Sequence, residues 1–183
     1  MQVPPGFPFL RIRQAPHAHL KVRYKDHCQG FLPNHAVHSH RAYLEGLAPQ
    51  LSLDVEGCSV LLVHGSPRKN NEDILPDTPI EEVEKMLVNV GADVVLCGHT
   101  HLPCGFQTSK KKTVVNAGSI GRPFTPEPKS CYLTIIVNNG ECLFEHHFVE
   151  YDKERASAKL RKREFEGADK LANMLLNPKV RHF

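Results

Sequence analysis

Three short apolar runs dominate the central part of the sequence. They span residues 60–63, 94–97 and 113–115, and none of them alternates with polar positions. A continuous apolar run of this length is typical of a strand that is covered on both faces, as in a parallel sheet. The pattern therefore predicts three buried strands in this part of the chain.

The clearest helical pattern lies between the first two of these runs. Its apolar residues recur at helical spacing on one face: Ile80, Val83, Met86, Leu87 and Val90. Thr78 and Glu81 have the spacing of a capping box, and Pro79 suits the first helical position. Gly91 is a natural stop. A strand-helix-strand unit of this kind predicts parallel pairing through a right-handed crossover.

Further elements are predicted on both sides of this unit. Residues 51–55 and 59–64 form strands around a turn at Glu56-Gly57. Residues 130–137 and 142–151 form a hairpin around Asn138-Asn139-Gly140, because Asn-Gly is a strong hairpin signal.

A polar helical stretch is expected to close the sequence. It begins near Lys153, is interrupted near Gly167 and ends before Pro178.

The length of 183 residues favours one domain, which we assign to residues 41–183. Residues 1–40 form an atypical N-terminal segment that holds half of the 12 histidines and shows no convincing period. Within it, residues 19–24 are a candidate strand. Residues 40–47 are expected to form a short helix.

Composition narrows the function classes. The formal net charge of +3 is too small to indicate a nucleic-acid partner, and the run Lys110-Lys111-Lys112 is typical of a solvated loop. No apolar run approaches the length of a membrane span, and the first residues lack the layout of a secretory signal. We therefore expect a cytoplasmic protein without a membrane partner.

The cysteines favour the same compartment. None of the six forms a C-x-x-C pair, and several lie in or beside apolar strands. We expect reduced thiols rather than a disulfide framework. A zinc-binding role for Cys97 or Cys104 fits no standard structural spacing.

Histidines follow two of the apolar runs. His64 comes directly after the first run, and His99 and His101 follow the second within Gly-His-Thr-His. On extended backbone, positions i and i+2 point to the same side, so His99 and His101 are expected to act together. Histidine is the commonest metal ligand in proteins. The sequence therefore predicts a metal site built from His64, His99 and His101.

A polar turn after the third apolar run offers further candidates for this pocket. Asn116 and Ser119 either donate to a phosphate or stabilise their own turn, and the second role is favoured. Arg122 is equally consistent with an anion contact and with an ordinary surface arginine. His146-His147 lie in a predicted strand and are interpreted as structural.

Three ordered motifs resemble a known family. They are Leu-Val-His-Gly-Ser-Pro at 62–67, Val-Leu-Cys-Gly-His-Thr-His at 95–101, and Val-Asn-Ala-Gly-Ser-Ile-Gly-Arg-Pro at 115–123. Together they resemble the C-terminal half of the calcineurin-like metallophosphoesterases, in particular the small bacterial and archaeal phosphodiesterase-like members.

The resemblance implies an α/β fold, a metallophosphoesterase-like β-sandwich flanked by helices. It also implies two divalent ions (Mn, Fe, Zn or Ni), with His64 and His99 on one ion and His101 on the other.

The motifs of the family's N-terminal half are absent from this sequence. The Asp-x-His pair, the Gly-Asp pair and the Gly-Asn-His-Asp/Glu motif are missing, as if the first strand-helix-strand portion were lacking. Asn34 and His35 come nearest to the missing motifs. Asn34 is the candidate oxygen ligand and His35 the candidate general acid. No other catalytic residue is assigned.

Three functions remain open. The first is a metal-dependent phosphoesterase that acts on a phosphorylated small molecule by phosphodiester or phosphomonoester hydrolysis. The second is a non-catalytic protein-interaction module on the same fold, and the third is a truncated fragment. If central strands are missing, the sheet has unpaired edges, and two copies of the chain could associate through them as a homo-oligomer.

Overall fold

The computed structural model describes residue 43, residues 45–127 and residues 129–178. The helices and strands in this part of the chain are, in order, β1 (Leu51–Val55), β2 (Cys58–Leu62), α2 (Ile80–Met86), β3 (Val94–Cys97), β4 (Cys104–Gln107), β5 (Thr113–Asn116), β6 (Ser130–Asn138), β7 (Glu141–Val149), α3 (Lys153–Arg161) and α4 (Ala168–Leu176). The candidate strand at 19–24 and the segment 1–40 lie outside the described residues. Of the expected helix at 40–47, residues 43 and 45 are helical.

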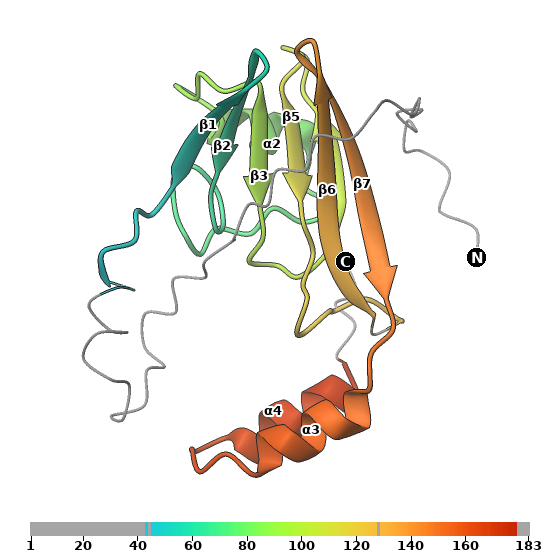
Figure 1. The fold of residues 1–183 in the computed structure, drawn as a ribbon. Helices are drawn as coiled ribbons and strands as arrows, with labels where there is room; N and C mark the ends of the chain where they lie inside the picture. Colours follow the sequence, from blue (N-terminus) through green and yellow to red (C-terminus); the bar gives the residue numbers. More distant parts are fainter. Residues whose placement is uncertain (1–42, 44, 128, 179–183) are drawn as a thin grey trace.

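A five-stranded sheet forms the centre of the molecule, with the strand order β1-β2-β3-β5-β4 (Figure 1). The three strands predicted from apolar runs lie side by side and pair in parallel: Val60 pairs with Val94, and Leu96 pairs with both Leu62 and Val115. Their carboxyl ends therefore meet at one edge of the sheet. β4 was not predicted, because its four residues include Gly105 and Gln107 and show no apolar run.

Helix α2 covers one face of this sheet. The predicted apolar face of the helix is confirmed, because Val83, Met86 and Leu87 are buried against β2, β3 and β5. The predicted helix ends are wrong. The helix begins after Pro79, which is its N-cap and supplies no side-chain hydrogen bond, and it ends at Met86 rather than near Gly91.

The expected capping box is also absent from α2. The hydroxyl of Thr78 instead accepts a hydrogen bond from the amide of Leu75 at 2.8 Å, so it stabilises the preceding turn.

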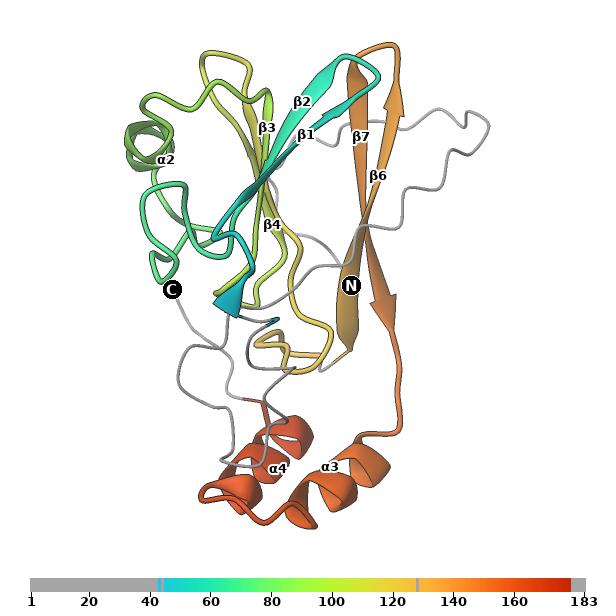
Figure 2. The ribbon, with the colours of Figure 1, turned by 60° about the vertical axis from the view of Figure 1, so that its left-hand side comes forward.

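The hairpin of β6 and β7 covers the other face of the central sheet, as Figure 2 shows from the side. Val137, Cys142 and Phe144 pack against buried residues of β2 and β3. The hairpin is confirmed, and its turn consists of Asn139 and Gly140 because Asn138 already pairs with Glu141; their φ values of 49° and 80° suit a type I′ turn. The predicted β-sandwich with flanking helices is therefore confirmed. No strand precedes β1 within the described residues.

Helices α3 and α4 pack against each other beyond the end of β7, away from the central sheet (Figure 1). The Asp152 carboxylate caps α3 by accepting from the amide of Arg155 at 2.8 Å. The buried hydroxyl of Ser157 in α3 donates to the carbonyl of Ala172 in α4 at 3.0 Å. The predicted interruption near Gly167 is confirmed, since this residue has φ 90° just before α4.

The five cysteines in the described part of the chain divide into two groups. A disulfide joins Cys58 in β2 to Cys142 in β7, so the expectation of reduced thiols is wrong for this pair. Cys97, Cys104 and Cys131 are buried free thiols, as expected of small core residues. Among the described helices, none has the length and apolar character needed to cross a bilayer.

We predict that Val83→Ala lowers the free energy of unfolding by about 2 kcal/mol, because it removes two methyl groups from a packed site and leaves a cavity. Val83 is fully buried, whereas Val88 is 65% exposed. The measurement is chemical denaturation of both alanine variants beside the wild type. A loss in Val88→Ala as large as that in Val83→Ala would contradict the assigned packing.

Candidate metal centre

His64 lies where the pairing of β2 with β3 continues past the end of the strands. The amide of Val63 donates to the carbonyl of Leu96 at 2.9 Å, and the amide of Gly98 donates to the carbonyl of His64 at 2.8 Å. These two bonds hold His64 beside the start of the Gly98–His101 loop. The parallel register thus positions one predicted ligand against the segment that carries the other two.

The chain then turns back sharply after His64. A Cβ on Gly65 would lie 2.6 Å from the carbonyl oxygen of Asn70 and 2.7 Å from that of Lys69. Only glycine fits so close an approach of backbone to backbone. Gly65 is therefore needed to fold the loop after His64.

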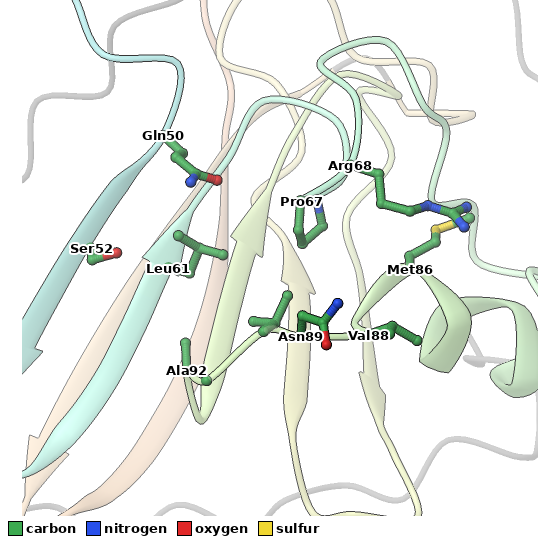
Figure 3. A pocket seen from close by; sticks show the side chains of 11 residues that line it. Gln50, Ser52, Leu61, Pro67, Arg68, Met86, Val88, Asn89 and Ala92 are labelled. Carbon is green, nitrogen blue, oxygen red and sulfur yellow. The ribbon is translucent and has the colours of Figure 1, made fainter.

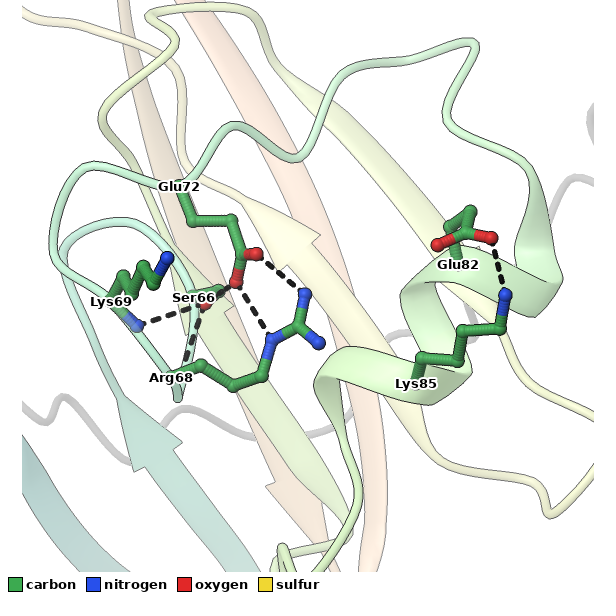
Figure 4. Close-up of polar contacts among 6 residues, drawn as sticks. All are labelled: Ser66, Arg68, Lys69, Glu72, Glu82 and Lys85. Atoms are coloured by element: carbon green, nitrogen blue, oxygen red, sulfur yellow. Dashed lines mark hydrogen bonds and ion pairs between the residues drawn. The ribbon is translucent and has the colours of Figure 1, made fainter.

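Side chains of this loop form a compact polar network (Figure 4). The Ser66 hydroxyl is buried; it donates to the carboxylate of Glu72 and accepts from the amides of Arg68 and Lys69. The Arg68 guanidinium donates to both carboxylate oxygens of Glu72, at 3.1 Å and 2.5 Å. The hydrogen bond from Arg68 lowers the pKa of Glu72, against desolvation and with a smaller contribution from Ser66. We call Ser66, Arg68 and Glu72 the loop latch.

The figure also draws the pair Glu82–Lys85 on α2. These side chains are 50% and 64% exposed, so the pair contributes little to stability.

His99 and His101 do not lie on extended backbone, which corrects the prediction. Strand β3 ends at Cys97, and the two histidines have φ values of 64° and 60°. The left-handed region is unfavourable for residues other than glycine, and such residues persist only where their surroundings hold them. The two side chains are therefore placed by a strained loop, not by strand alternation.

Asn116 at the end of β5 holds that loop. Its side chain is 1% exposed, and its amide nitrogen donates to the carbonyl of Gly98 at 2.6 Å and to the hydroxyl of Thr100 at 2.9 Å. Its amide oxygen accepts from the backbone of Gly118 at 3.0 Å. Asn116 therefore stabilises its own turn and the histidine loop together, in line with the role favoured from the sequence.

The rings of His64 and His99 are in direct contact. Nε2 of His64 lies 3.3 Å from Nδ1 of His99, with the ring planes at 71°. Two nitrogen ligands roughly 2.0–2.1 Å from a tetrahedral ion lie about 3.3–3.4 Å apart. The separation of these two atoms thus fits joint ligation of one ion. In the protein without metal, it fits a hydrogen bond between the imidazoles.

His101 is held by the turn that follows β5. Its Nδ1 lies 2.7 Å from the carbonyl oxygen of Arg122, so Nδ1 carries the proton and Nε2 is the basic nitrogen of the neutral ring. Its ring stacks on Phe124, with centroids 5.3 Å apart, and the Arg122 guanidinium lies 5.0 Å from the centroid of Phe124. The Ser119 hydroxyl accepts from the amide of Arg122 at 3.0 Å, which closes the turn.

Arg122 is not the ordinary surface arginine that was one of its two interpretations, and the anion contact stays a prediction. It is half-buried, packs over Phe124 and approaches the sulfur of Met174 in α4 at 4.0 Å. Its role in the described structure is to support the ring of His101.

The structure therefore brings His64 and His99 together and anchors His101 through a separate turn. In the part of the chain that is described, no group of three or more His, Cys, Asp or Glu side chains is arranged to hold a metal ion. Burial raises the pKa of Cys104 to about 12 and raises the pKa of Cys97 still further, so both stay protonated thiols at neutral pH.

One residue beside the histidines was missed from the sequence. Oδ1 of Asp73 lies 3.4 Å from Nε2 of His99, on the opposite side of the ring from His64. Asp73 lies in a polar loop without periodicity, so only the folding of that loop over His99 identifies it.

The adjacent histidines of β7 are structural, as interpreted. His146 donates from Nε2 to the backbone carbonyl of Asn116 at 2.7 Å, and burial lowers the pKa of its ring. His147 stacks on Tyr132, with centroids 4.7 Å apart.

A cavity of about 420 Å³ lies apart from the histidines, between β1, β2 and the segment after α2 (Figure 3). Gln50, Ser52 and Leu61 line one side of it, and Pro67 and Arg68 contribute from the loop after His64. None of the three predicted ligands lines this cavity.

Comparison with known families gives a match over most of the described sandwich. The model of the calcineurin-like phosphoesterase superfamily domain matches residues 26–140. The match begins inside the atypical N-terminal segment and includes Asn34 and His35. A search of curated proteins found no match.

Two solved structures resemble this chain. A hypothetical protein from Pyrococcus horikoshii is 27% identical with a TM-score of 0.63, over 74% of this chain and 54% of that protein. A metallophosphoesterase from Sphaerobacter thermophilus is 22% identical with a TM-score of 0.62, over 77% of this chain and 62% of that protein. The chain thus spans little more than half the length of these two proteins.

We predict that Asn116→Ala destabilises the protein by about 3 kcal/mol, because it leaves buried partners of the histidine loop unsatisfied. Faster hydrogen exchange at the amides of Gly98 and Thr100 should accompany the loss. The matched control is Asn71→Ala, at an exposed position of the loop after His64. Unchanged stability and exchange in Asn116→Ala would contradict the role assigned to this side chain.

The loop latch predicts a pH dependence. Because the pKa of Glu72 is lower in the folded protein, its contribution to stability is complete above the ordinary value of about 4.3 and is lost as pH falls through the lower folded value. The stability difference between wild type and Glu72→Gln should therefore shrink on acidification.

The partner variant provides the control for the latch. In an Arg68→Gln background the same Glu72→Gln difference should be smaller and less dependent on pH, since Arg68 is the main cause of the shift. A wild-type difference that does not change with pH would rule out the latch. The measurement is urea unfolding between pH 3 and pH 7.

Proposed function

Because this chain belongs to the calcineurin-like phosphoesterase superfamily, we propose that it is a metal-dependent phosphoesterase that hydrolyses phosphodiesters or phosphomonoesters. The observation that carries the proposal is the 3.3 Å separation between Nε2 of His64 and Nδ1 of His99. It is the separation expected of two nitrogen ligands on one ion. These nitrogens come from two different strand ends and meet without an intervening side chain.

In this proposal His64 and His99 hold one divalent ion, and His101 holds a second. Mn, Fe, Zn and Ni all accept imidazole ligands, so the metal identity stays open. Such ions polarise a phosphate and lower the pKa of a bound water. The bond from Nδ1 of His101 to the carbonyl of Arg122 supports this role, because it leaves Nε2 as the ligating nitrogen.

The remaining ligands are sought among residues outside the described part. Asn34 as an oxygen ligand and His35 as a general acid stay predictions, and both fall within the matched residues 26–140. In this proposal, the described residues around the candidate centre orient the rings of His99 and His101. Asn116 holds the loop of His99, and the turn at Ser119 and Arg122 holds the ring of His101.

The substrate class in the proposal is a phosphorylated small molecule. A cytoplasmic location and the absence of nucleic-acid and membrane partners belong to the same proposal, and rest on the modest net charge of +3 and the lack of long apolar runs.

A protein-interaction module is the second candidate. One observation favours it: Tyr132 and Val149, which point to the same face of the β6–β7 hairpin, are 45% and 47% exposed. Exposed aromatic side chains on a sheet are typical of protein interfaces. This candidate predicts a folded protein that holds no stoichiometric metal.

Single histidine variants separate the two candidates. The wild type should bind about two divalent ions per chain and hydrolyse a p-nitrophenyl phosphodiester or monoester. Each of His64→Ala, His99→Ala and His101→Ala should lose about one ion and all turnover, because each removes a ligand. The double variant His64→Ala/His99→Ala should lose no more metal than either single variant, because both residues hold the same ion. Adding His101→Ala to either single variant should remove the second ion as well.

His147→Ala is the matched control, since this histidine stacks on Tyr132 and belongs to neither ligand group. Elemental analysis and a steady-state assay give the two readouts. Wild-type protein that binds no divalent ion and shows no turnover above background would contradict the enzyme and favour the interaction module.

A further inference from the structure

We propose that Asp73 is a positioning residue for His99: its carboxylate lies within ion-pair distance of Nε2, favours the proton on that nitrogen and leaves Nδ1 unprotonated toward His64. The inference rests on the proposed function for its purpose, which is to prepare Nδ1 as a ligand. The contact that carries it is the 3.4 Å distance from Oδ1 of Asp73 to Nε2 of His99.

The two nitrogens of His99 face different partners. Nε2 faces the carboxylate of Asp73, and Nδ1 faces Nε2 of His64 at 3.3 Å. An ionised carboxylate only accepts hydrogen bonds, and a neutral imidazole carries one N–H. The tautomer with the proton on Nε2 satisfies both contacts, because it leaves a lone pair on Nδ1 for a hydrogen bond from His64.

The same arrangement suits a metal ion in place of that hydrogen bond. Histidine ligands commonly donate their second ring N–H to a carboxylate, which sets the tautomer and orients the ring. A divalent ion that displaces the proton between His64 and His99 would meet two unprotonated nitrogens. Asp73 then stays on the far nitrogen and holds the ring in place.

The backbone on both sides of Asp73 is held. Before it, Glu72 belongs to the loop latch, in which Arg68 and the buried Ser66 bind its carboxylate. After it, Ile74 is 1% exposed and packs in the core beneath α2. Although the side chain of Asp73 is 42% exposed, its position relative to His99 is therefore set by two anchored neighbours.

One loop thus serves both nitrogens of one ring. Residues 64–73 follow the end of β2, turn tightly at Gly65 and return to place Asp73 against His99. The ring of His99 is enclosed between the start and the end of the same loop. The loop latch acts on the candidate centre through this second contact as well as through His64.

The test reads the tautomer of His99 directly, in protein without metal. Long-range ¹H–¹⁵N spectra of the histidine rings are recorded well above the ordinary histidine pKa of about 6.5. Wild type should show a single His99 tautomer with the proton on Nε2, and Asp73→Ala should show a mixture. Asp73→Asn should keep the wild-type tautomer, because an amide oxygen can still accept from Nε2.

Zinc titration calorimetry gives the second readout. Asp73→Ala should weaken Zn²⁺ binding roughly ten- to hundredfold, with Asp73→Asn intermediate. Asp77→Ala is the matched control, because Asp77 is exposed in the same loop region and is expected to change neither readout.

The outcomes separate this inference from the proposed function. A wild type that protonates Nδ1, or an unchanged tautomer and zinc affinity in Asp73→Ala, overturns the role of Asp73 and leaves the phosphoesterase proposal standing. A wild type that binds no Zn²⁺, with a His99 tautomer that still depends on Asp73, overturns the metal centre and supports the positioning contact.

Discussion

Parallel pairing of β2, β3 and β5 is the constraint on which the candidate centre depends. Because Val60 pairs with Val94, and Leu96 pairs with Val115, the three strands end at the same edge of the sheet. His64, the Gly98–His101 loop and Asn116 follow those ends. A shift of one register position would separate these groups and turn their side chains to other faces. The buried apolar residues of the sandwich therefore determine where the chemistry is located.

Local backbone strain at His99 and His101 is the second feature that shapes the candidate centre. Two histidines in left-handed backbone cost roughly 1–3 kcal/mol each, and nothing in their own sequence offsets that cost. The buried amide of Asn116 and the carbonyl of Arg122 hold them from outside the loop. The hydrogen bonds that stabilise the strained loop also orient the two imidazole rings. Stability and site geometry are thus coupled in one small network at the end of β5.

The sequence predicts the scaffold better than the site. Apolar runs identified the buried strands, and the Asn-Gly pair identified the hairpin, because burial and turn chemistry are local properties. The prediction of where α2 begins and ends was wrong. Thr78 stabilises the preceding turn, and Pro79 is the N-cap without a side-chain hydrogen bond. The left-handed backbone conformation of His99 and its contact with Asp73 arise only when distant segments of the chain meet. Residue spacing in the sequence therefore cannot predict them. The disulfide between Cys58 and Cys142 likewise depends on how the hairpin lies over the sheet.

Whether His64 and His99 ligate the same ion can be tested by zinc titration of protein that carries ¹⁵N-labelled histidine. If they share one ion, the ¹⁵N resonances of His64 Nε2 and His99 Nδ1 should move together and saturate at the same equivalent of Zn²⁺. Nε2 of His99 should also keep its proton throughout. Movement of one ring without the other, or coordination of His99 through Nε2, would contradict shared ligation through these two nitrogens.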